Sequence, residues 1–327
     1  SQVFYECSML DKIKIPPFVS MIGSFTFYGC SSLTQLSLPS SLSTIEESLF
    51  SQCLSLTQFV VPSSVSTICD NAFSGCILLA SIVIPSSVTK IGNGVFNGCT
   101  SIKLNSIPTS VTELGDNVFS GCSSLNSISI PSSLLSIGKN VFSGCTVLTS
   151  ISIPNTILSI GNNAFTGCSL IQGISIPASV TTLGDEVFKG CSQLRQMTIP
   201  NSVTSIGYSV FQDCPLLSQL TIQSSLDSIK ANFCYGCSTL GGFAIPSPVK
   251  SLGENSFYGC LVLNSISIPS TVKKIGKNSF KLCQTLKQVT IPTSVEVIGD
   301  GAFYGCSQLT SITIPSSQIS LVCVRLT

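Results

Sequence analysis

Residues 145–167 read Cys-Thr-Val-Leu-Thr-Ser-Ile-Ser-Ile-Pro-Asn-Thr-Ile-Leu-Ser-Ile-Gly-Asn-Asn-Ala-Phe-Thr-Gly, and this unit recurs along the whole chain. Its cysteine returns every 23 residues from Cys7 to Cys306 and accounts for 14 of the 17 cysteines. Fixed self-similarity of this kind is typical of a solenoid, whose stacked repeats share one core. A chain of 327 residues would otherwise suggest two globular domains. We instead expect one repeat domain over residues 1–327, with about 14 repeats, the first partial and the last degenerate.

The apolar positions within a repeat predict its local structure. Counted from the cysteine as position 0, apolar side chains recur at positions 3, 6, 8, 12, 15 and 20. Positions 6 and 8 alternate with polar residues at 5 and 7, which is the period of a strand. Proline at position 9 ends that strand because it has no N–H to donate. We expect a second short extended piece over positions 12–15 and a tight bend at the glycine of position 16. A single helical or 3₁₀ turn should follow, ending near the phenylalanine of position 20.

One repeat is too small to fold alone, so its strands must pair with those of its neighbours in parallel sheets. The two ends of the chain differ from the middle. The chain enters in mid-repeat, which indicates a processed or excised piece, and it starts without a signal-peptide pattern. The last repeat decays at Gln318, where the apolar residue of position 12 is expected.

Composition excludes several classes of function. The chain has no histidine and no tryptophan, so neither a Ser-His-Asp or Cys-His catalytic group nor a histidine-ligated metal site can form. Only 9% of residues are charged, with 15 basic against 14 acidic, which gives no reason to expect nucleic acid as a partner. The apolar runs are too short to span a membrane. We therefore expect no enzyme, no cofactor, no metal and no membrane insertion.

The cysteine series could be a disulfide scaffold, a metal stack or a packing position. Stacked copies should lie about 4.8 Å apart at Cα, which is within disulfide range. Pairing them two by two would break the repeat symmetry, and a free cysteine is a small, readily buried side chain. Buried free thiols are therefore the favoured interpretation.

Three cysteines lie outside the series. Cys234 and Cys237 form a C-x-x-C, the spacing of redox and zinc motifs. The register favours a simpler interpretation, in which Cys234 occupies the phenylalanine position and Phe233 is displaced beside it. Cys69, in the glycine position, and Cys323, in the decayed last repeat, are the candidates for exposed, reactive thiols.

Six lysines crowd the stretch from Lys250 to Lys287, against the single acid Glu254. This stretch could be a docking site for an acidic partner. The register favours stacked columns of charge instead, in which opposite charges on neighbouring repeats are mildly stabilising. Position 13 carries Asp227, Lys250, Lys273 and Glu296 in one column, and position 17 carries Glu254, Lys277 and Asp300, which alternate in sign.

The outward face of the main strand, at positions 5 and 7, is an uncharged array of hydroxyls and amides. Small polar residues suit any solvated sheet face, but the array can also be a broad recognition surface for an extended protein or a glycan. An ice-binding lattice is a weaker interpretation, because glutamine and glycine interrupt the hydroxyls. The candidate ligand-binding residues are Ser127, Ser129, Ser150, Ser152, Ser175, Gln196, Thr198, Gln219, Thr221, Ser265, Ser267, Gln288 and Thr290.

Irregular positions interrupt the pattern elsewhere. Towards the N-terminus, Val60, Val83 and Leu104 should place apolar side chains on the outward face, as a small interaction patch. Asn105 puts an amide in the apolar position 6. Residues 213–234 lose the usual glycine, proline and phenylalanine, so we expect the least stable internal segment there.

Two stretches carry a resemblance to a known family. Leu252-Gly-Glu-Asn-Ser-Phe-Tyr-Gly-Cys260 and Leu263-Asn-Ser-Ile-Ser-Ile-Pro269 resemble the BspA-like leucine-rich repeats, and the pattern covers essentially the whole chain. The resemblance implies a leucine-rich repeat solenoid of the α/β horseshoe class, mostly β, right-handed, with a parallel sheet on its concave side and single helical or 3₁₀ turns on its convex side. It also implies surface-exposed or secreted proteins of bacteria and protists that adhere to host matrix proteins or other cells. The family has no shared catalytic residues.

Together, these features predict a non-enzymatic recognition or adhesion module at the cell surface or outside the cell. Its partner would be a host matrix protein, a cell-surface protein or a glycan, bound through the concave sheet. One alternative is self-association into a filament or coat, through end-to-end or lateral contacts. The terminal repeats would distinguish the recognition module from the filament or coat. A monomeric solenoid needs polar terminal repeats, whereas a filament keeps them cohesive. Another alternative is a cytoplasmic leucine-rich repeat scaffold.

Overall fold

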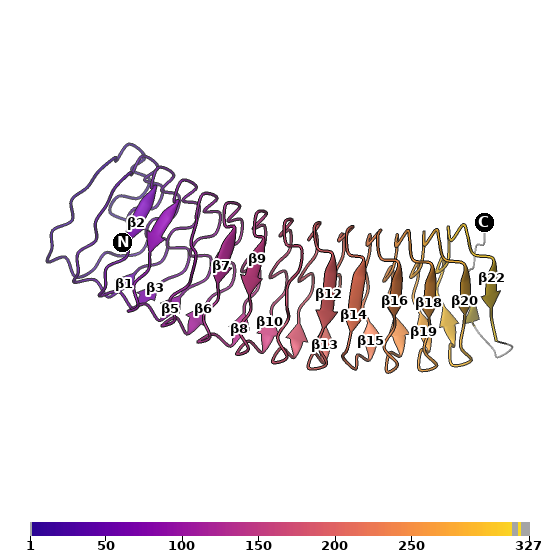
Figure 1. Cartoon of the computed structure of the whole chain (residues 1–327). Coiled ribbons are helices and arrows are strands. Elements are labelled where there is room, and N and C mark those ends of the chain that lie inside the picture. Colours follow the sequence, from indigo (N-terminus) through magenta and orange to yellow (C-terminus); the bar gives the residue numbers. More distant parts are fainter. Residues whose placement is uncertain (1, 316–319, 322–327) are drawn as a thin grey trace. The chain divides into compact units, whose positions relative to one another are not determined.

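The computed structural model describes residues 2–315 and 320–321. Over these residues the chain is a parallel β-solenoid without a helix, in which each repeat forms one turn (Figure 1). Its packing divides into two units, residues 1–157 with 167–169 and residues 158–166 with 170–327. Gln318 and Cys323 lie outside the described residues.

The main strands occupy positions 5–7 or 5–8 of their repeats and confirm the predicted strand. In the first unit they are β2 (Gln58–Val60), β4 (Ser81–Val83), β7 (Ser127–Ser129) and β9 (Ser150–Ser152). In the second unit they are β12 (Gln196–Ile199), β14 (Gln219–Ile222), β16 (Gly242–Ala244), β18 (Ser265–Ser267), β20 (Gln288–Thr290) and β22 (Ser311–Thr313). Paired residues are one repeat apart, as in Val60 with Val83 and Gln196 with Gln219.

A second set of two-residue strands occupies positions 14 and 15. In the first unit they are β1 (Thr44–Ile45), β3 (Thr67–Ile68), β5 (Lys90–Ile91), β6 (Glu113–Leu114) and β8 (Ser136–Ile137). In the second unit they are β10 (Ser159–Ile160), β11 (Thr182–Leu183), β13 (Ser205–Ile206), β15 (Ser228–Ile229), β17 (Ser251–Leu252), β19 (Lys274–Ile275), β21 (Val297–Ile298) and β23 (Ser320–Leu321). These strands also pair in parallel, in the register Ile45 to Ile68 and Ser228 to Ser251.

Hydrogen-bonded turns stand where a helical or 3₁₀ turn was expected, at positions 17–22. Alternate backbone N–H groups donate to the next repeat, from Asn117 to Lys139 O at 2.8 Å and from Phe119 to Val141 O at 2.9 Å. This alternation requires left-handed backbone at Asn117, with φ of 60°, and at Gly121, with φ of 72°. Half of these N–H groups therefore bond between repeats, whereas the others bond within the repeat, as from Ser120 to Asn117 O at 3.1 Å. In a helix all of them would bond within one repeat.

The glycines of position 16 have a different role from the predicted one. Gly115 has no left-handed backbone, but a Cβ on it would lie 2.6 Å from the backbone N of Asn93 and from the backbone C of Gly92. Glycine is needed because the neighbouring repeat approaches too closely for a side chain. At position 17, Asn93 Oδ1 accepts the N–H of Asp116 at 2.8 Å, and Asp116 Oδ1 accepts that of Lys139 at 2.7 Å. This side-chain ladder was not predicted from the sequence.

The core consists of columns of identical side chains between the two sets of strands. Within the first unit, the rings of Phe119 and Phe142 stack with centroids 5.7 Å apart and planes 3° from parallel. Beside this column the series cysteines from Cys30 to Cys306 are buried free thiols, as predicted, and only Cys7 is exposed. Stacking thus gives each repeat the core that it lacks alone.

Three sequence expectations do not hold. Asn105 is exposed, so its amide does not enter the core, and Leu104 beside it is half-buried. This repeat has no main strand but only an isolated bridge from Ser106 to Ser129. Cys69 is half-buried, and burial followed by the nearby carboxylates of Glu46 and Asp70 raises the pKa of its thiol. A thiolate is the reactive form, so Cys69 lacks the environment of a reactive cysteine.

Candidate functional site on the polar strand face

The outward side chains at positions 5 and 7 of the main strands form one surface in each unit, which we call the polar strand face. Every predicted ligand-binding residue lies on it, and all are exposed except Ser127, which is half-buried. In the first unit, Ser127 and Ser129 of β7 lie beside Ser150 and Ser152 of β9. In the second unit, Gln196 and Thr198 of β12 pair with Gln219 and Thr221 of β14.

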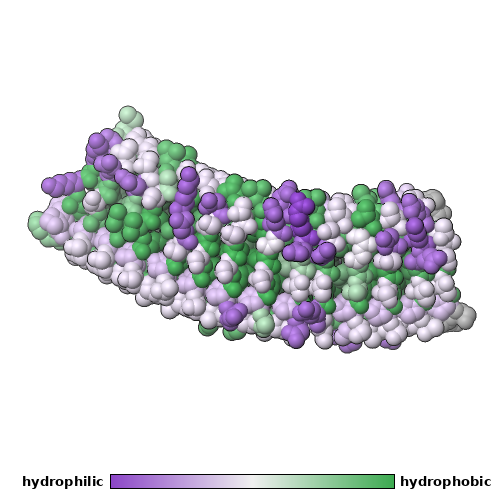
Figure 2. Space-filling model, viewed as in Figure 1, coloured by the Kyte–Doolittle hydropathy of each residue, from purple (hydrophilic) through white to green (hydrophobic). Residues whose placement is uncertain are grey.

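The remaining candidates also belong to the second unit. Ser265 and Ser267 lie on β18, with Gln288 and Thr290 on the adjacent β20. Ser175 belongs to a repeat that forms no main strand. Figure 2 shows the pale and purple side chains in rows over the main strands, with green apolar residues between the rows.

Buried neighbours hold these side chains in place. Met197 and Leu220 alternate with the polar residues of β12 and β14 and point into the core. Within the described part of the chain, the hydroxyls of Thr198 and Thr221 and the amides of Gln196 and Gln219 make no side-chain hydrogen bond. Their donors and acceptors are therefore available to a ligand.

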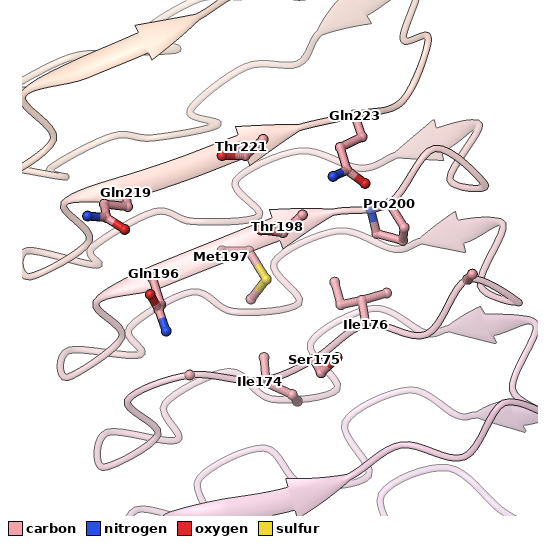
Figure 3. A pocket seen from close by; sticks show the side chains of 12 residues that line it. Ile174, Ser175, Ile176, Gln196, Met197, Thr198, Pro200, Gln219, Thr221 and Gln223 are labelled. Carbon is pink, nitrogen blue, oxygen red and sulfur yellow. The ribbon is translucent and has the colours of Figure 1, made fainter.

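A shallow hollow of about 690 Å³ opens in the polar strand face of the second unit. Five of the predicted residues line it, together with residues from both sides of β12 (Figure 3). The lining residues are Gly173, Ile174, Ser175, Ile176, Ala178, Gln196, Met197, Thr198, Pro200, Gln219, Thr221 and Gln223. None of them is charged, so the hollow suits an uncharged ligand that forms hydrogen bonds.

Two local departures from the repeat are part of this hollow. Gly173 stands where most other repeats carry serine or glutamine, and a Cβ on it would meet nothing within 4 Å. Gln223 replaces the proline of position 9, and its backbone N–H donates to Ile199 O at 2.9 Å, which a proline could not do. From the sequence alone, Gln223 looks like random divergence from the repeat pattern. The sequence signal that could have pointed to the hollow was the loss of this proline, together with the unusual Gly173 two repeats earlier.

The lysine-rich stretch contains the predicted charge column. Lys250 Nζ lies 3.6 Å from Asp227 Oδ2, and Lys273 Nζ lies 2.8 Å from Glu296 Oε1. These two pairs confirm the predicted charge column at position 13, in which Asp227 and Glu296 flank the adjacent lysines. No ion pair joins Glu254, Lys277 and Asp300 over the residues that the structure describes. Lys281 lies over the rings of Tyr258 and Tyr304, 5.6 Å and 5.0 Å from their centroids.

The C-x-x-C is a packing feature, as the register predicted. The N–H of Cys234 donates to Ser256 O at 2.7 Å, as the phenylalanine of other repeats does, and Phe233 packs edge-on against Phe211. Both Cys234 and Cys237 are buried, and burial holds the pKa of Cys234 well above its usual value. In the described ranges, no group of three cysteine, aspartate or glutamate side chains could hold a metal ion. None of the described residues belongs to a helix long and apolar enough to cross a membrane.

Comparisons with known proteins agree with this geometry. A leucine-rich repeat protein from Bacteroides ovatus is 33% identical, with a TM-score of 0.86 over 95% of this chain and 83% of that chain. One from Eubacterium ventriosum is 25% identical, with a TM-score of 0.62 over 93% of this chain and 90% of that one. A leucine rich cell surface protein from Faecalibacterium prausnitzii is 27% identical, with a TM-score of 0.57 over 80% and 82%. A search of curated proteins returned no significant match.

The sequence itself matches one repeat family over nearly its whole length. The family described as BspA type leucine rich repeat region (6 copies) matches residues 1–126, 112–241 and 227–322. The chain therefore belongs to the BspA type leucine-rich repeat family.

Proposed function

We propose that this protein is a non-enzymatic recognition module that acts at the cell surface or outside the cell. Its partner is an adhesion ligand: a host matrix protein, a cell-surface protein or a glycan. The family supports a role in protein recognition, and the similar protein from Faecalibacterium prausnitzii is described as a cell surface protein.

The observation that carries the proposal is the uncharged hollow across β12 and β14. Gln196, Thr198, Gln219 and Thr221 line it and offer hydrogen-bonding groups that no neighbouring side chain uses. Each such bond adds little, but a row of them on a preorganised sheet adds up to specific binding. The ligand is held through many weak contacts, and no bond in it is made or broken.

A binding test can use the glycine at the edge of the hollow. Gly173→Gln places an amide side chain in the open space beside Ser175 without a steric clash. We expect it to fill the hollow and to weaken, by about tenfold or more, the binding of a ligand identified on an array of matrix proteins and glycans. Surface plasmon resonance with the purified chain measures the change.

Gly242→Gln is the matched control. Gly242 occupies the same position of its repeat, on β16, and an added Cβ would likewise meet nothing within 4 Å, but it does not line the hollow. Equal loss of binding in both variants, or in neither, would contradict the assignment of the hollow. Replacing Ser150 and Ser152 by lysine tests the first unit in the same assay, and undiminished binding there would limit the site to the second unit.

A further inference from the structure

A different surface lies at the N-terminal end of the first unit. Positions 5 and 7 carry no charge in any repeat but one, where they are Lys12 and Lys14. Both lysines are exposed, and neither forms an ion pair with a described residue. Asp11, the neighbouring acid, accepts a hydrogen bond from Thr34 at 2.7 Å. Within the described residues, this surface thus begins with two exposed lysines that form no ion pair.

Two repeats further along, the same face becomes apolar. Val60 is 67% exposed and Val83 is 55% exposed, and the two are register partners on β2 and β4. Position 7 is serine or threonine in most other repeats, so valine here exposes an aliphatic surface without any gain to the core. Figure 2 shows green atoms gathered over this part of the first unit.

Two adjoining hollows connect the lysines to Val60, and Val83 lies on the next strand beyond them. One, of about 470 Å³, is lined by Lys12 and Lys14, and the other, of about 530 Å³, by Gln58 and Val60. They share Gln35, Leu36 and Ser37 as lining residues and so form one trough across three repeats. The main strand is absent from residues 12–14 and 35–37, which are joined only by a bridge from Lys12 to Gln35.

We propose that this trough is a second recognition site, for an extended polypeptide segment in which acidic residues lie a few positions away from aliphatic ones. Charge complementarity selects carboxylates opposite Lys12 and Lys14, and the valines select aliphatic side chains. The surface has no exposed aromatic ring at positions 5 and 7 on which a sugar could stack. The site differs in place and in chemistry from the uncharged hollow of the second unit.

The spacing of the repeats sets the pattern of the segment. Neighbouring strands lie about 4.8 Å apart, so Lys14 and Val60, two repeats apart, are separated by about 10 Å along the trough. An extended chain covers that distance in about three residues. The segment should therefore carry its carboxylates about three residues away from its nearest aliphatic side chain.

A labelled peptide, Glu-Glu-Ser-Ser-Val-Thr-Val-Ser-Ser-Glu-Glu, has the required spacing in either chain direction and provides the probe, and fluorescence anisotropy with the full chain measures its binding. We expect saturable binding that weakens as ionic strength rises, because the charges are exposed. The same peptide with lysine in place of glutamate should not bind. Absence of binding by the glutamate peptide, or equal binding of both peptides, would overturn the proposal.

Three double variants identify the contacts. K12E/K14E should lower affinity for the glutamate peptide by about tenfold or more and create affinity for the lysine peptide. V60S/V83S should lower affinity roughly tenfold through lost apolar contact. K12Q/K14S gives the first repeat the residues that the next repeat has at the same positions and should lose the salt dependence of binding.

All four substituted positions are exposed, so we expect every variant to fold. Circular dichroism and the melting temperature of each variant check this. Unchanged peptide binding in K12E/K14E would overturn the site. So would binding of phosphatidylserine vesicles that the glutamate peptide does not displace, because it would assign the lysines to a lipid surface. Gly173 is untouched in these variants, so the site in the second unit is tested separately.

Discussion

The thiol of Cys122 donates a hydrogen bond to the backbone carbonyl oxygen of Phe96, with 3.2 Å between sulfur and oxygen. The same oxygen accepts the backbone N–H of Cys99 at 3.0 Å. Equivalent bonds recur in both units, for example from Cys145 to Phe119 and from Cys237 to Phe211. Cysteine at position 0 therefore fills the core and also ties each turn to the one before it.

Removing this thiol should destabilise the solenoid. Cys122→Ala loses the bond to Phe96 and leaves a small cavity, so we expect the free energy of unfolding to fall by about 1–3 kcal/mol. Urea unfolding followed by circular dichroism measures the change. Cys7→Ala is the control, because Cys7 has the same position in its repeat but is exposed. Its effect should stay within about 0.5 kcal/mol, and a similar loss in both variants would contradict a role for the bond.

The buried thiols make stability depend on pH in the alkaline range. Burial raises the pKa of Cys145 from 9.0 to about 12. Between these values the unfolded chain has lost the proton and the folded chain keeps it, so stability falls as pH rises. Each such thiol should remove roughly 1.4 kcal/mol per pH unit in this range, and none below it.

Urea unfolding at a series of pH values tests this dependence. Cys145→Ala removes one titrating group, so its stability should decline less steeply above pH 9.0 than that of the unchanged chain. Equal slopes in the two proteins would show that Cys145 ionises equally in the folded and unfolded states.

The glycines of position 16 should tolerate no side chain. In Gly115→Ala the new Cβ would meet backbone atoms of the neighbouring repeat at 2.6 Å, so turns of the solenoid must separate. We expect a loss of about 2 kcal/mol or more, in the range of overpacked sites. Gly173→Ala serves as the comparison, since nothing lies within 4 Å of its added Cβ.

Gly173→Ala should leave stability unchanged or raise it by about 0.4–1 kcal/mol, because alanine restricts the unfolded chain. Thermal unfolding of the two variants side by side measures both effects. Similar melting temperatures would refute close approach as the reason for glycine at position 16.

The irregular segment 213–234 contains a buried polar group without a partner. Ser224 is 2% exposed, and its hydroxyl has no hydrogen bond within the described part of the chain. Ser224→Ala should therefore stabilise the protein by about 1–2 kcal/mol. Ser132→Ala, an exposed serine at the same position of its repeat, should have almost no effect.

Hydrogen exchange tests the wider prediction for this segment. Amides of residues 213–234 should exchange faster than those of the regular repeat at residues 122–144, and Ser224→Ala should slow them. If amides of the regular repeats exchanged faster than those of residues 213–234, this segment would not be the least stable internal one.

Some of the fold and the site could be predicted because identical residues in stacked repeats must share an environment. The alternation at Ser150, Ile151 and Ser152 predicted which side chains face solvent, and the exposed residues of β9 include both serines. The register predicted the ion pairs of Lys250 and Lys273, because each lysine shares position 13 with an acidic residue of the neighbouring repeat. A one-dimensional stack turns a distance of 23 residues into direct contact, so the period alone gave these neighbours.

Features that depend on close approach or on a single irregular repeat were not predictable. The hydrogen bond that the backbone N–H of Lys139 donates to Asp116 Oδ1 requires a distance of 2.7 Å that composition does not specify. Gln223 and Gly173 each look like a lost repeat residue, and only the folded chain places both around one hollow.

The sequence by itself determined the period, the parallel pairing, the buried cysteine and phenylalanine columns and the outward polar positions, because apolar residues at fixed spacing leave only one register in which all are buried. Only the tertiary structure decided why position 16 is glycine, where the hollows open, and how Cys122 is bonded. Those features depend on separations between neighbouring turns of a few ångströms, and such distances are fixed only when backbone and side chains pack together.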